Sequence, residues 1–177
     1  MSAAVAHRGE RRWLTRPETA ADAAAVRRVV LSAFPTAAEA DLVDALREDA
    51  AWLPGLSFVA AAPDGEIAGY ALLTRCRVGG AAALALAPVA VLPAYQRQGA
   101  GGAAVEAALA AAAGRGERLV VVLGHPEYYP RFGFERASRH GVTAPFEVPD
   151  EALMALVLDG PGPVPSGAIE YPAPFGV

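Results

Sequence analysis

The spacing of hydrophobic positions changes several times along the chain, and each spacing predicts a different element. Between residues 20 and 49 apolar side chains recur every three or four positions, as in amphipathic helices. We expect one helix over residues 20–34 and a second over residues 37–49, separated at Pro35. In the second helix Val43 belongs to the apolar stripe, and Glu39 is expected largely on the opposite, solvated side.

The pattern then becomes typical of strands. Asp64-Gly65 is a hairpin signal between residues 57–62 and 66–78. Residues 83–91 and 119–123 are almost continuously apolar, which is typical of strands buried on both faces. Between them we expect a glycine-rich loop and a helix over residues 101–113, and therefore a parallel, right-handed crossover. Shorter elements are expected at residues 14–16 (strand), 126–132 (helix), 153–158 (strand) and 168–171 (strand).

This order of elements predicts an α+β fold. Its central sheet is mixed and mostly antiparallel, with one parallel β-α-β crossover, and helices flank it. We expect residues 1–12 to form a flexible leader and residues 13–177 to form a single domain. A C-terminal extension of strands and turns begins at about residue 142.

Composition and charge exclude several classes of protein. Of the 177 residues 54 % are hydrophobic, many of them alanine, so the core is expected to contain small side chains. A net charge of −4 argues against a nucleic-acid partner, and no apolar run approaches the ~18 residues that span a membrane. Cys76 is the single cysteine, which suits a reducing compartment, and we expect a cytoplasmic protein without a membrane partner. No histidine, cysteine or carboxylate cluster has metal-ligand spacing, so no metal is expected.

The segment from Gln96 to Gly102 carries the clearest chemical signal. Glycines at 99 and 101 let a ligand approach the backbone closely. The amides ahead of the predicted helix would converge at its N-terminus, where unpaired N–H groups and the helix dipole favour an anion. Arg97 adds a positive charge. These features predict a phosphate or pyrophosphate site.

Other readings of the loop fit less well. A Walker loop needs lysine followed by serine or threonine, and Gly101-Gly102-Ala103 supplies neither. The dinucleotide fingerprint matches glycines 99 and 101 and Ala104, but it starts at the end of the strand, and here residues 92–98 intervene. That fingerprint also requires an acidic residue at the end of the second strand, where this chain has Gly124. A loop that only turns the chain is the third reading.

Two motifs in this order resemble a known family. Val89-Ala90-Val91-Leu92-Pro93 followed by Tyr95-Gln96-Arg97-Gln98-Gly99-Ala100-Gly101 is similar to the acetyl-CoA signature of the GCN5-related N-acetyltransferases (GNAT). Tyr129-Pro130-Arg131-Phe132-Gly133-Phe134 resembles their Tyr-x-x-x-Gly-Phe motif, and residues 119–132 are similar to the YhbS-like subgroup. Many relatives carry an asparagine after the second parallel strand. This chain has Gly124-His125-Pro126 there, so the asparagine's role does not transfer.

The resemblance implies a GNAT-like fold in which the two parallel strands splay and hold the pantetheine of acetyl-CoA between them. Backbone groups along Val89-Ala90-Val91 would pair with pantetheine, and the Val91 amide would also donate to the thioester carbonyl. The diphosphate would bind the amides of Gln96, Arg97, Gln98, Gly99, Ala100, Gly101 and Gly102. The resemblance further implies acetyl transfer to a primary amine, on a small molecule or a protein, and a possible homodimer. A non-catalytic acyl-CoA-binding or sensory module is the alternative.

The sequence identifies only some of the catalytic groups. Tyr129 is the candidate acid for the leaving thiolate, because a tyrosine hydroxyl stays protonated near pH 7. Tyr128 is the second candidate and a predicted cofactor contact, and Tyr129 could instead only pack beneath the cofactor. The general base is open between Glu39, His125 and a water chain. Cys76, Trp13 and Trp52 are expected to be packing residues, and the acceptor amine is not identified by the sequence.

Overall fold

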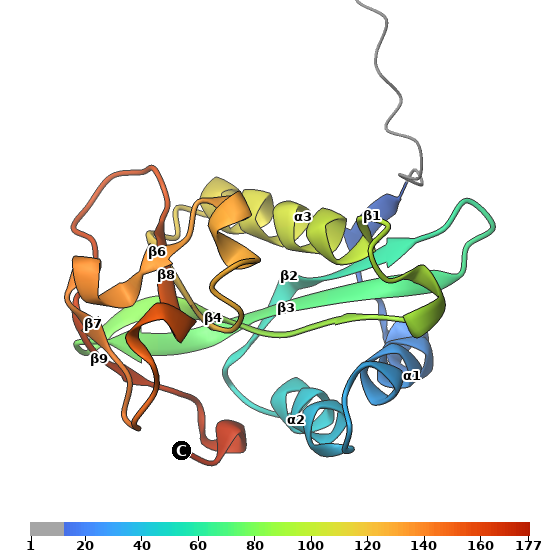
Figure 1. Ribbon diagram of the computed structural model, residues 1–177, viewed down its shortest axis with the longest axis horizontal. Helices are drawn as coiled ribbons and strands as arrows, with labels where there is room; N and C mark the ends of the chain where they lie inside the picture. Colours follow the sequence, from blue (N-terminus) through green and yellow to red (C-terminus); the bar gives the residue numbers. More distant parts are fainter. Residues whose placement is uncertain (1–12) are drawn as a thin grey trace, which may run out of the picture.

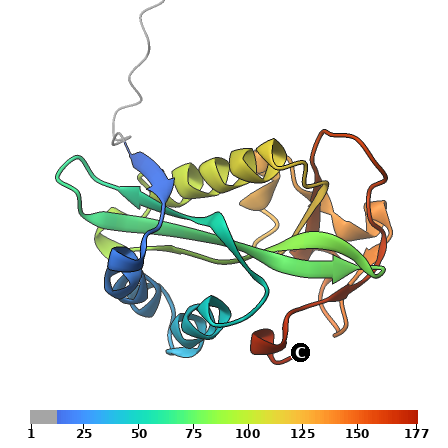
Figure 2. The same cartoon turned by 180° about the vertical axis from the view of Figure 1, so that it is seen from behind.

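In the computed structural model, which describes residues 13–177, a nine-stranded sheet lies between two layers of helices (Figure 1). The predicted leader, residues 1–12, lies outside the described residues. Figures 1 and 2 show α3 (Ala100–Gly114) on one face of the sheet and α1 (Ala23–Ala33) and α2 (Ala38–Arg47) on the other. The predicted fold class is therefore confirmed.

The strands are β1 (Leu14–Pro17), β2 (Trp52–Ala61), β3 (Ile67–Val78), β4 (Ala81–Val91), β5 (Leu119–Leu123), β6 (Glu135–Arg136), β7 (Val142–Thr143), β8 (Leu153–Val157) and β9 (Gly167–Glu170). Short 3-10 helices are η1 (Ala20–Asp22), η2 (Pro93–Tyr95), η3 (Tyr129–Phe132), η4 (Ala137–His140), η5 (Asp150–Ala152) and η6 (Ala173–Phe175).

The sheet has the order β1-β2-β3-β4-β5-β8-β6, and β9 pairs with both β3 and β7. Neighbouring strands are antiparallel except β4 with β5, the predicted crossover around α3, and β7 with β9. The second parallel pair was not predicted, because a two-residue strand such as β7 has no periodicity to read. The chain after residue 142 joins the same sheet through β8, which pairs with β5, and β9, which pairs with β3.

Two predicted helices are shorter than expected. Residues 20–22 form a 3-10 turn in which the Asp22 carboxylate accepts a hydrogen bond from the backbone of Thr19 at 2.7 Å. In the predicted helix over residues 126–132 only the last four residues are helical, again as a 3-10 turn. Pro130 lies inside that segment and has no backbone N–H to continue a helix, which explains the short turn.

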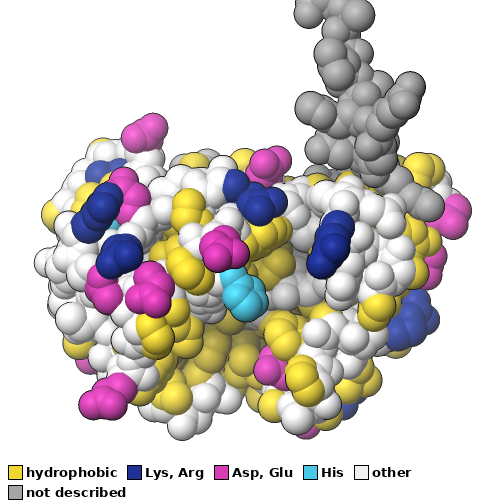
Figure 3. All heavy atoms as spheres, in the orientation of Figure 1, with side chains coloured by type: hydrophobic (Ala, Val, Ile, Leu, Met, Phe, Trp, Pro, Cys, Tyr) yellow, Lys and Arg dark blue, Asp and Glu magenta, His cyan; other side chains and the backbone are white. Residues whose placement is uncertain are grey.

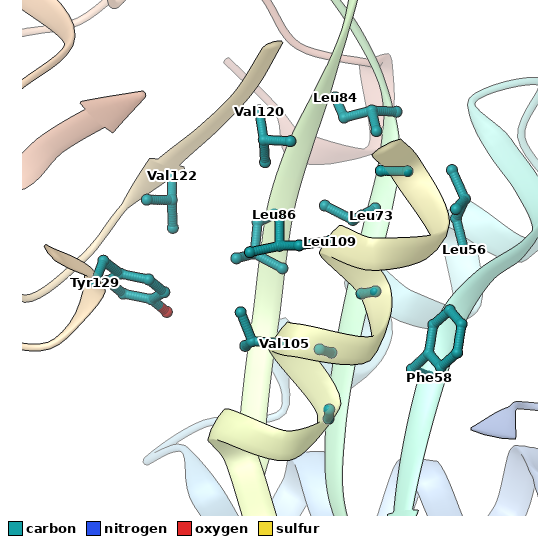
Figure 4. Packing of buried hydrophobic residues seen from close by; sticks show 14 of the residues in the cluster. Leu56, Phe58, Leu73, Leu84, Leu86, Val105, Leu109, Val120, Val122 and Tyr129 are labelled. Atoms are coloured by element: carbon teal, nitrogen blue, oxygen red, sulfur yellow. The ribbon is translucent and has the colours of Figure 1, made fainter. Parts of the chain in front are cut away.

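Small residues let α3 approach the sheet closely. Ala104, Ala108 and Ala112 recur at every fourth position and are fully buried against the sheet. Larger side chains from the strands fill the space around the helix (Figure 4), including Leu56, Phe58, Leu73, Leu84, Leu86, Val120 and Val122. The opposite face packs against α1 and α2 in a second buried cluster. A third cluster lies beneath β7 and β9, and it contains Cys76.

Candidate active site

The two central parallel strands part soon after they meet. β4 and β5 pair at only two positions, of which Ala85 opposite Val121 is the second. β4 nevertheless continues to Val91, and β5 continues to Leu123 along β8. A gap therefore opens between the carboxyl-terminal halves of two neighbouring strands.

A bulge in β4 explains where the gap begins. Val89 lies opposite Ala71 of β3, whereas Leu86 lies opposite Leu73, so β4 contains one residue more than β3 over this interval. The extra residue falls beside Pro88, which has no backbone N–H for a ladder hydrogen bond. A bulge bends the strand that carries it. The proline within the strand was a signal for the splay that sequence reasoning missed.

A cavity of about 840 Å³ occupies this gap and extends to the start of α3. Every residue predicted to act in catalysis or cofactor binding lines it: Val89, Ala90, Val91, Gln96, Arg97, Gln98, Gly99, Ala100, Gly101, Gly102, Tyr128 and Tyr129. Sequence reasoning missed four further lining residues: Ala33, Phe34, Tyr95 and Arg131. The arginine adds a second cation to the cavity wall, and its place in the Tyr-Pro-Arg-Phe segment was the available signal.

The glycine-rich loop delivers backbone amides to this cavity. Arg97 and Gly99 both have left-handed backbone conformations, with φ of +62° and +86°. Gly99 is the N-cap of α3, and its carbonyl oxygen accepts the first helical bond from Ala103 at 2.9 Å. The amides of the first three helical residues, 100–102, therefore have no acceptor within the helix, and together with the helix dipole they favour an anion.

Trp13 fastens this loop from outside the cavity. Its indole N–H donates to the carbonyl oxygen of Gln98 at 2.7 Å. The indole also meets the ring of Tyr95 edge-on, with 5.6 Å between centroids. The Tyr95 hydroxyl donates in turn to Glu66 at 2.6 Å. Trp13 is thus more than the packing residue that we expected, because it holds the backbone of the glycine-rich loop.

Along the wall formed by β4, alternate amides face the cavity. The amide of Leu92 donates to the carbonyl of Ala68 in the neighbouring chain segment at 2.8 Å. Hydrogen-bonding directions alternate along a strand, so the amides of Val91 and Val89 point the other way, into the gap. Gly101 packs closely here, since a Cβ on it would lie 3.0 Å from a methyl carbon of Val91.

Tyr129 forms the opposite wall. It is 9 % exposed, and Figure 4 shows its hydroxyl directed from the β5 side toward Val105 of α3. Its ring lies against Gly124: a Cβ at that position would be 2.4 Å from Cε2 of the tyrosine. Burial raises the pKa of Tyr129 to about 12, so the hydroxyl keeps its proton at neutral pH.

Tyr128 occupies a different part of the cavity. Its hydroxyl lies 3.4 Å from the position of a Cβ on Gly101, next to the anion-binding loop. The guanidinium of Arg131 covers its ring at 4.3 Å from the centroid, and burial raises the pKa of this hydroxyl as well. The two tyrosine rings meet edge-on at 5.1 Å. The neighbours therefore contact different parts of the site, Tyr128 the loop and Tyr129 the end of β5.

The candidate bases have different surroundings. His125 is exposed and lines the cavity. Our expectation that Glu39 lies on a solvated side was wrong: it is half-buried, and its Oε2 atom is buried with no hydrogen-bond partner among the described residues. Glu39 is four residues before buried Val43, on the inward side of α2, and it does not line the cavity. Cys76 is buried, as expected, and burial raises the pKa of its thiol to about 12.

No group of three or more histidine, cysteine, aspartate or glutamate side chains within the described residues could hold a metal ion. In the same range no helix is long and apolar enough to cross a membrane.

Comparison with known proteins assigns the family. The model of the "Acetyltransferase (GNAT) family" matches residues 23–134, which include both motifs and the cavity-lining loop. The chain belongs to the GNAT family. Among curated GNAT relatives, the uncharacterised N-acetyltransferase YjhQ of Escherichia coli K12 is 40 % identical over 135 residues, 73 % of this chain and 74 % of YjhQ. The uncharacterised N-acetyltransferase YhbS of the same strain is 33 % identical over 170 residues, 89 % of this chain and 95 % of YhbS.

Solved structures of GNAT proteins agree. The E. coli YhbS structure in complex with CoA has a TM-score of 0.85 and 31 % identity, and the match covers 94 % of this chain and 93 % of that one. A GNAT acetyltransferase from Brucella melitensis in complex with acetyl-CoA has a TM-score of 0.75 and 33 % identity, over 94 % and 99 % of the two chains. The resemblance to the YhbS-like subgroup is thereby confirmed.

Proposed function

We propose that this GNAT protein transfers the acetyl group of acetyl-CoA to a primary amine by direct attack of the amine on the thioester. One observation carries the proposal. A single cavity joins the amide-rich start of α3 to a buried, protonated tyrosine across the gap between two parting strands. Complexes of two GNAT relatives with CoA and acetyl-CoA support acetyl-CoA as the cosubstrate.

The donor fits this cavity end to end. The diphosphate binds the amides of residues 100–102, with Arg97 and Arg131 at the same cavity wall. Pantetheine extends along β4 and pairs with the amides of Val89 and Val91. Val91 is the predicted donor to the thioester carbonyl. Val89 is the second candidate, because it lies farther from the diphosphate loop and the thioester is the far end of the cofactor.

The proposed chemistry moves one acetyl group and two protons. The nitrogen lone pair of the neutral amine attacks the thioester carbon, a C–N bond forms, and a backbone amide stabilises the oxyanion. The C–S bond then breaks. The thiolate of CoA takes a proton from the Tyr129 hydroxyl, and the nitrogen releases a proton to His125 or to water. The Tyr129 phenolate then takes a proton from solvent, which restores the enzyme.

Transfer and binding are tested separately. Calorimetry with CoA measures the donor site, and thiol release from acetyl-CoA with a panel of amines measures the reaction. Tyr129→Phe should lower kcat roughly ten-fold or more with little change in CoA affinity, whereas Tyr128→Phe should mainly weaken CoA binding. CoA binding without transfer to any amine would favour the non-catalytic module instead.

The base is tested by pH dependence. If His125 accepts the amine proton, His125→Gln removes the acidic limb of the kcat/KM profile, while Glu39→Gln leaves it in place. An unchanged profile in His125→Gln would assign the proton to water. A cytoplasmic location and a homodimer stay predictions, for fractionation and for light scattering respectively.

A further inference from the structure

A second, smaller cavity of about 260 Å³ lies where β4 and β5 part. Ala85 and Val121, the last residues that pair across the two strands, lie in its wall. Both belong to the buried cluster beneath β7 and β9, whereas α3 packs with their neighbours Leu84 and Val120. Side chains alternate between the faces of a sheet, so Ala85, Ala87, Val121 and Leu123 line the cavity from the face away from α3. Leu86 and Val122, which belong to the cluster around α3, also reach the cavity where the strands part.

The small cavity begins where the proposed donor site ends. On β4 its wall reaches Ala87, and the donor cavity starts two residues later at Val89. On β5 its wall reaches Leu123, and the donor cavity resumes two residues later at His125. Two strand residues span roughly 7 Å. A small molecule in the second cavity can therefore place an amine beside the thioester end of the donor.

The remaining wall comes from the C-terminal part of the chain and is aromatic. Phe146 stacks on Tyr171 with centroids 6.0 Å apart and an interplanar angle of 23°, and Phe175 packs against the same tyrosine at 5.2 Å. Figure 3, which looks along the sheet with α3 above it, shows hydrophobic side chains gathered in a hollow between α2 and the C-terminal segment.

No charged side chain contributes to the wall. The described residues that line it are Ala85, Leu86, Ala87, Val121, Val122, Leu123, Phe146, Tyr171, Phe175 and Val177. Leu123 is 47 % exposed and lines this cavity, so its side chain lies where the cavity meets solvent. A polyamine or an aminoglycoside would bring further positive charges to a wall whose described side chains include no carboxylate, which is unfavourable.

We propose that this cavity, the apolar acceptor cavity, binds the hydrophobic group of the acceptor, and that the acceptor is a small primary amine joined to one aromatic ring or branched alkyl group. The inference rests on the proposed acetyl transfer and adds the substrate class. The volume corresponds to about nine water molecules, enough for one ring or a short branched chain. The amine then points out of the cavity along β4 toward Val89.

Binding and turnover are measured independently. Calorimetry on the CoA-loaded protein compares 2-phenylethylamine and isoamylamine with putrescine and spermidine. Thiol release from acetyl-CoA with the same amines gives kcat/KM. We expect the two apolar amines to bind, and their kcat/KM to exceed that of putrescine roughly 30-fold or more.

A variant that adds a charged side chain to the cavity wall tests the assignment. Leu123→Glu should lower kcat/KM for 2-phenylethylamine about 10-fold or more without changing CoA affinity, since a carboxylate replaces apolar surface at the mouth. Leu31→Glu is the matched control: Leu31 is a leucine of α1, 40 % exposed and outside both cavities, and its replacement should change neither value.

The outcomes separate the two proposals. Binding of the apolar amines without any acetyl transfer would refute the proposed function and leave the cavity assignment in place. Transfer that prefers putrescine or spermidine, or that Leu123→Glu leaves unchanged, would overturn the cavity assignment while acetyl transfer stands. A further arm uses short peptides with N-terminal phenylalanine or leucine, and a preference for them over the free amines would overturn the small-molecule acceptor.

Discussion

The close contact between Gly124 and Tyr129 allows the proposed acid to be displaced without removing it. Gly124 has no positive φ, so alanine can adopt its backbone conformation, and the added methyl group is the main perturbation. That Cβ would lie 2.4 Å from Cε2 of Tyr129 and 3.0 Å from Cδ2. The Gly124→Ala variant must therefore move the ring.

The size of the displacement follows from these distances. Ordinary contact begins at 3.4 Å, so the ring edge must retreat by about 1 Å from its position at 2.4 Å. A shift of this size at a catalytic group costs up to roughly 100-fold in rate, and we expect kcat to fall about 10- to 100-fold. Crowding the buried ring should also lower the free energy of unfolding by about 1–3 kcal/mol.

The assay follows thiol release at saturating acetyl-CoA and amine, with CoA affinity measured by calorimetry. CoA affinity should change little, because Gly124 does not line the cavity in which we place CoA. Gly114→Ala is the matched control. A Cβ there meets nothing within 4 Å, so kcat should stay unchanged and the helix should gain slightly in stability.

A double mutant isolates the hydroxyl. If Gly124→Ala acts by moving the Tyr129 hydroxyl, adding it to Tyr129→Phe should lower kcat much less than it does in the parent protein. An unchanged kcat in the single variant would refute the reasoning. A loss of the same size in both backgrounds would show that the glycine acts on something other than the hydroxyl.

Three further predictions concern the supports of the site and of the fold. Trp13→Phe removes the 2.7 Å hydrogen bond to the Gln98 carbonyl, so the Kd for CoA should rise roughly 2- to 12-fold at unchanged kcat. Trp52→Phe is the control. If Trp13→Phe changes the Kd no more than Trp52→Phe does, the loop keeps its conformation without the indole. Glu18→Ala removes a 6 % exposed carboxylate that accepts hydrogen bonds from Arg47 and Tyr70, both at 2.7 Å, and from Ser57. We expect the free energy of unfolding, measured in urea, to fall by about 3–5 kcal/mol, and the control Glu48→Ala, at an exposed position, to change it little. The pKa of Asp22 is lowered by its hydrogen bonds from Arg16, so the stability that the carboxylate contributes is present above the unfolded pKa near 4 and is lost as pH falls below it. In Asp22→Asn the free energy of unfolding should therefore fall less steeply than in the parent protein between about pH 5 and pH 2. The same pH dependence in both proteins would contradict this.

The residues that line the larger cavity were predictable because their signal is local. The spacing of glycines 99 and 101 before a helix reports backbone geometry that depends on the adjacent residues alone, and all twelve predicted residues line one cavity. Strand and helix periodicities likewise located the larger elements. The predicted helix boundaries were wrong where a side chain took the place of a helical hydrogen-bond acceptor, as at Asp22, or where a proline interrupted the helix, as at Pro130.

The cavity that we propose for the acceptor was not predictable, because its wall residues are distant in sequence. Phe146, Tyr171 and Phe175 meet Leu123 only after β9 has paired with β3 and the C-terminal segment has folded beneath the sheet. Glu39 was misplaced for a related reason. Its position on the inward side of α2 is set by how the helix packs, and an amphipathic pattern with a wide apolar stripe does not fix that angle closely.

Gly124 leaves room for the ring of Tyr129 just after β5. The ring of Tyr129 occupies the volume that any side chain at 124 would need, so glycine and this tyrosine position are mutually dependent. The bulge at Pro88 has a comparable effect on the other strand, because it directs the amide of Val89 into the donor cavity and leaves Ala87 in the wall of the apolar acceptor cavity. The walls of the two cavities approach each other to within two residues along both strands, with the proposed acid after β5 and the proposed oxyanion donors on β4. The proposed donor site and the proposed acceptor cavity therefore depend on the same local break in the sheet, where β4 and β5 stop pairing beside the bulge.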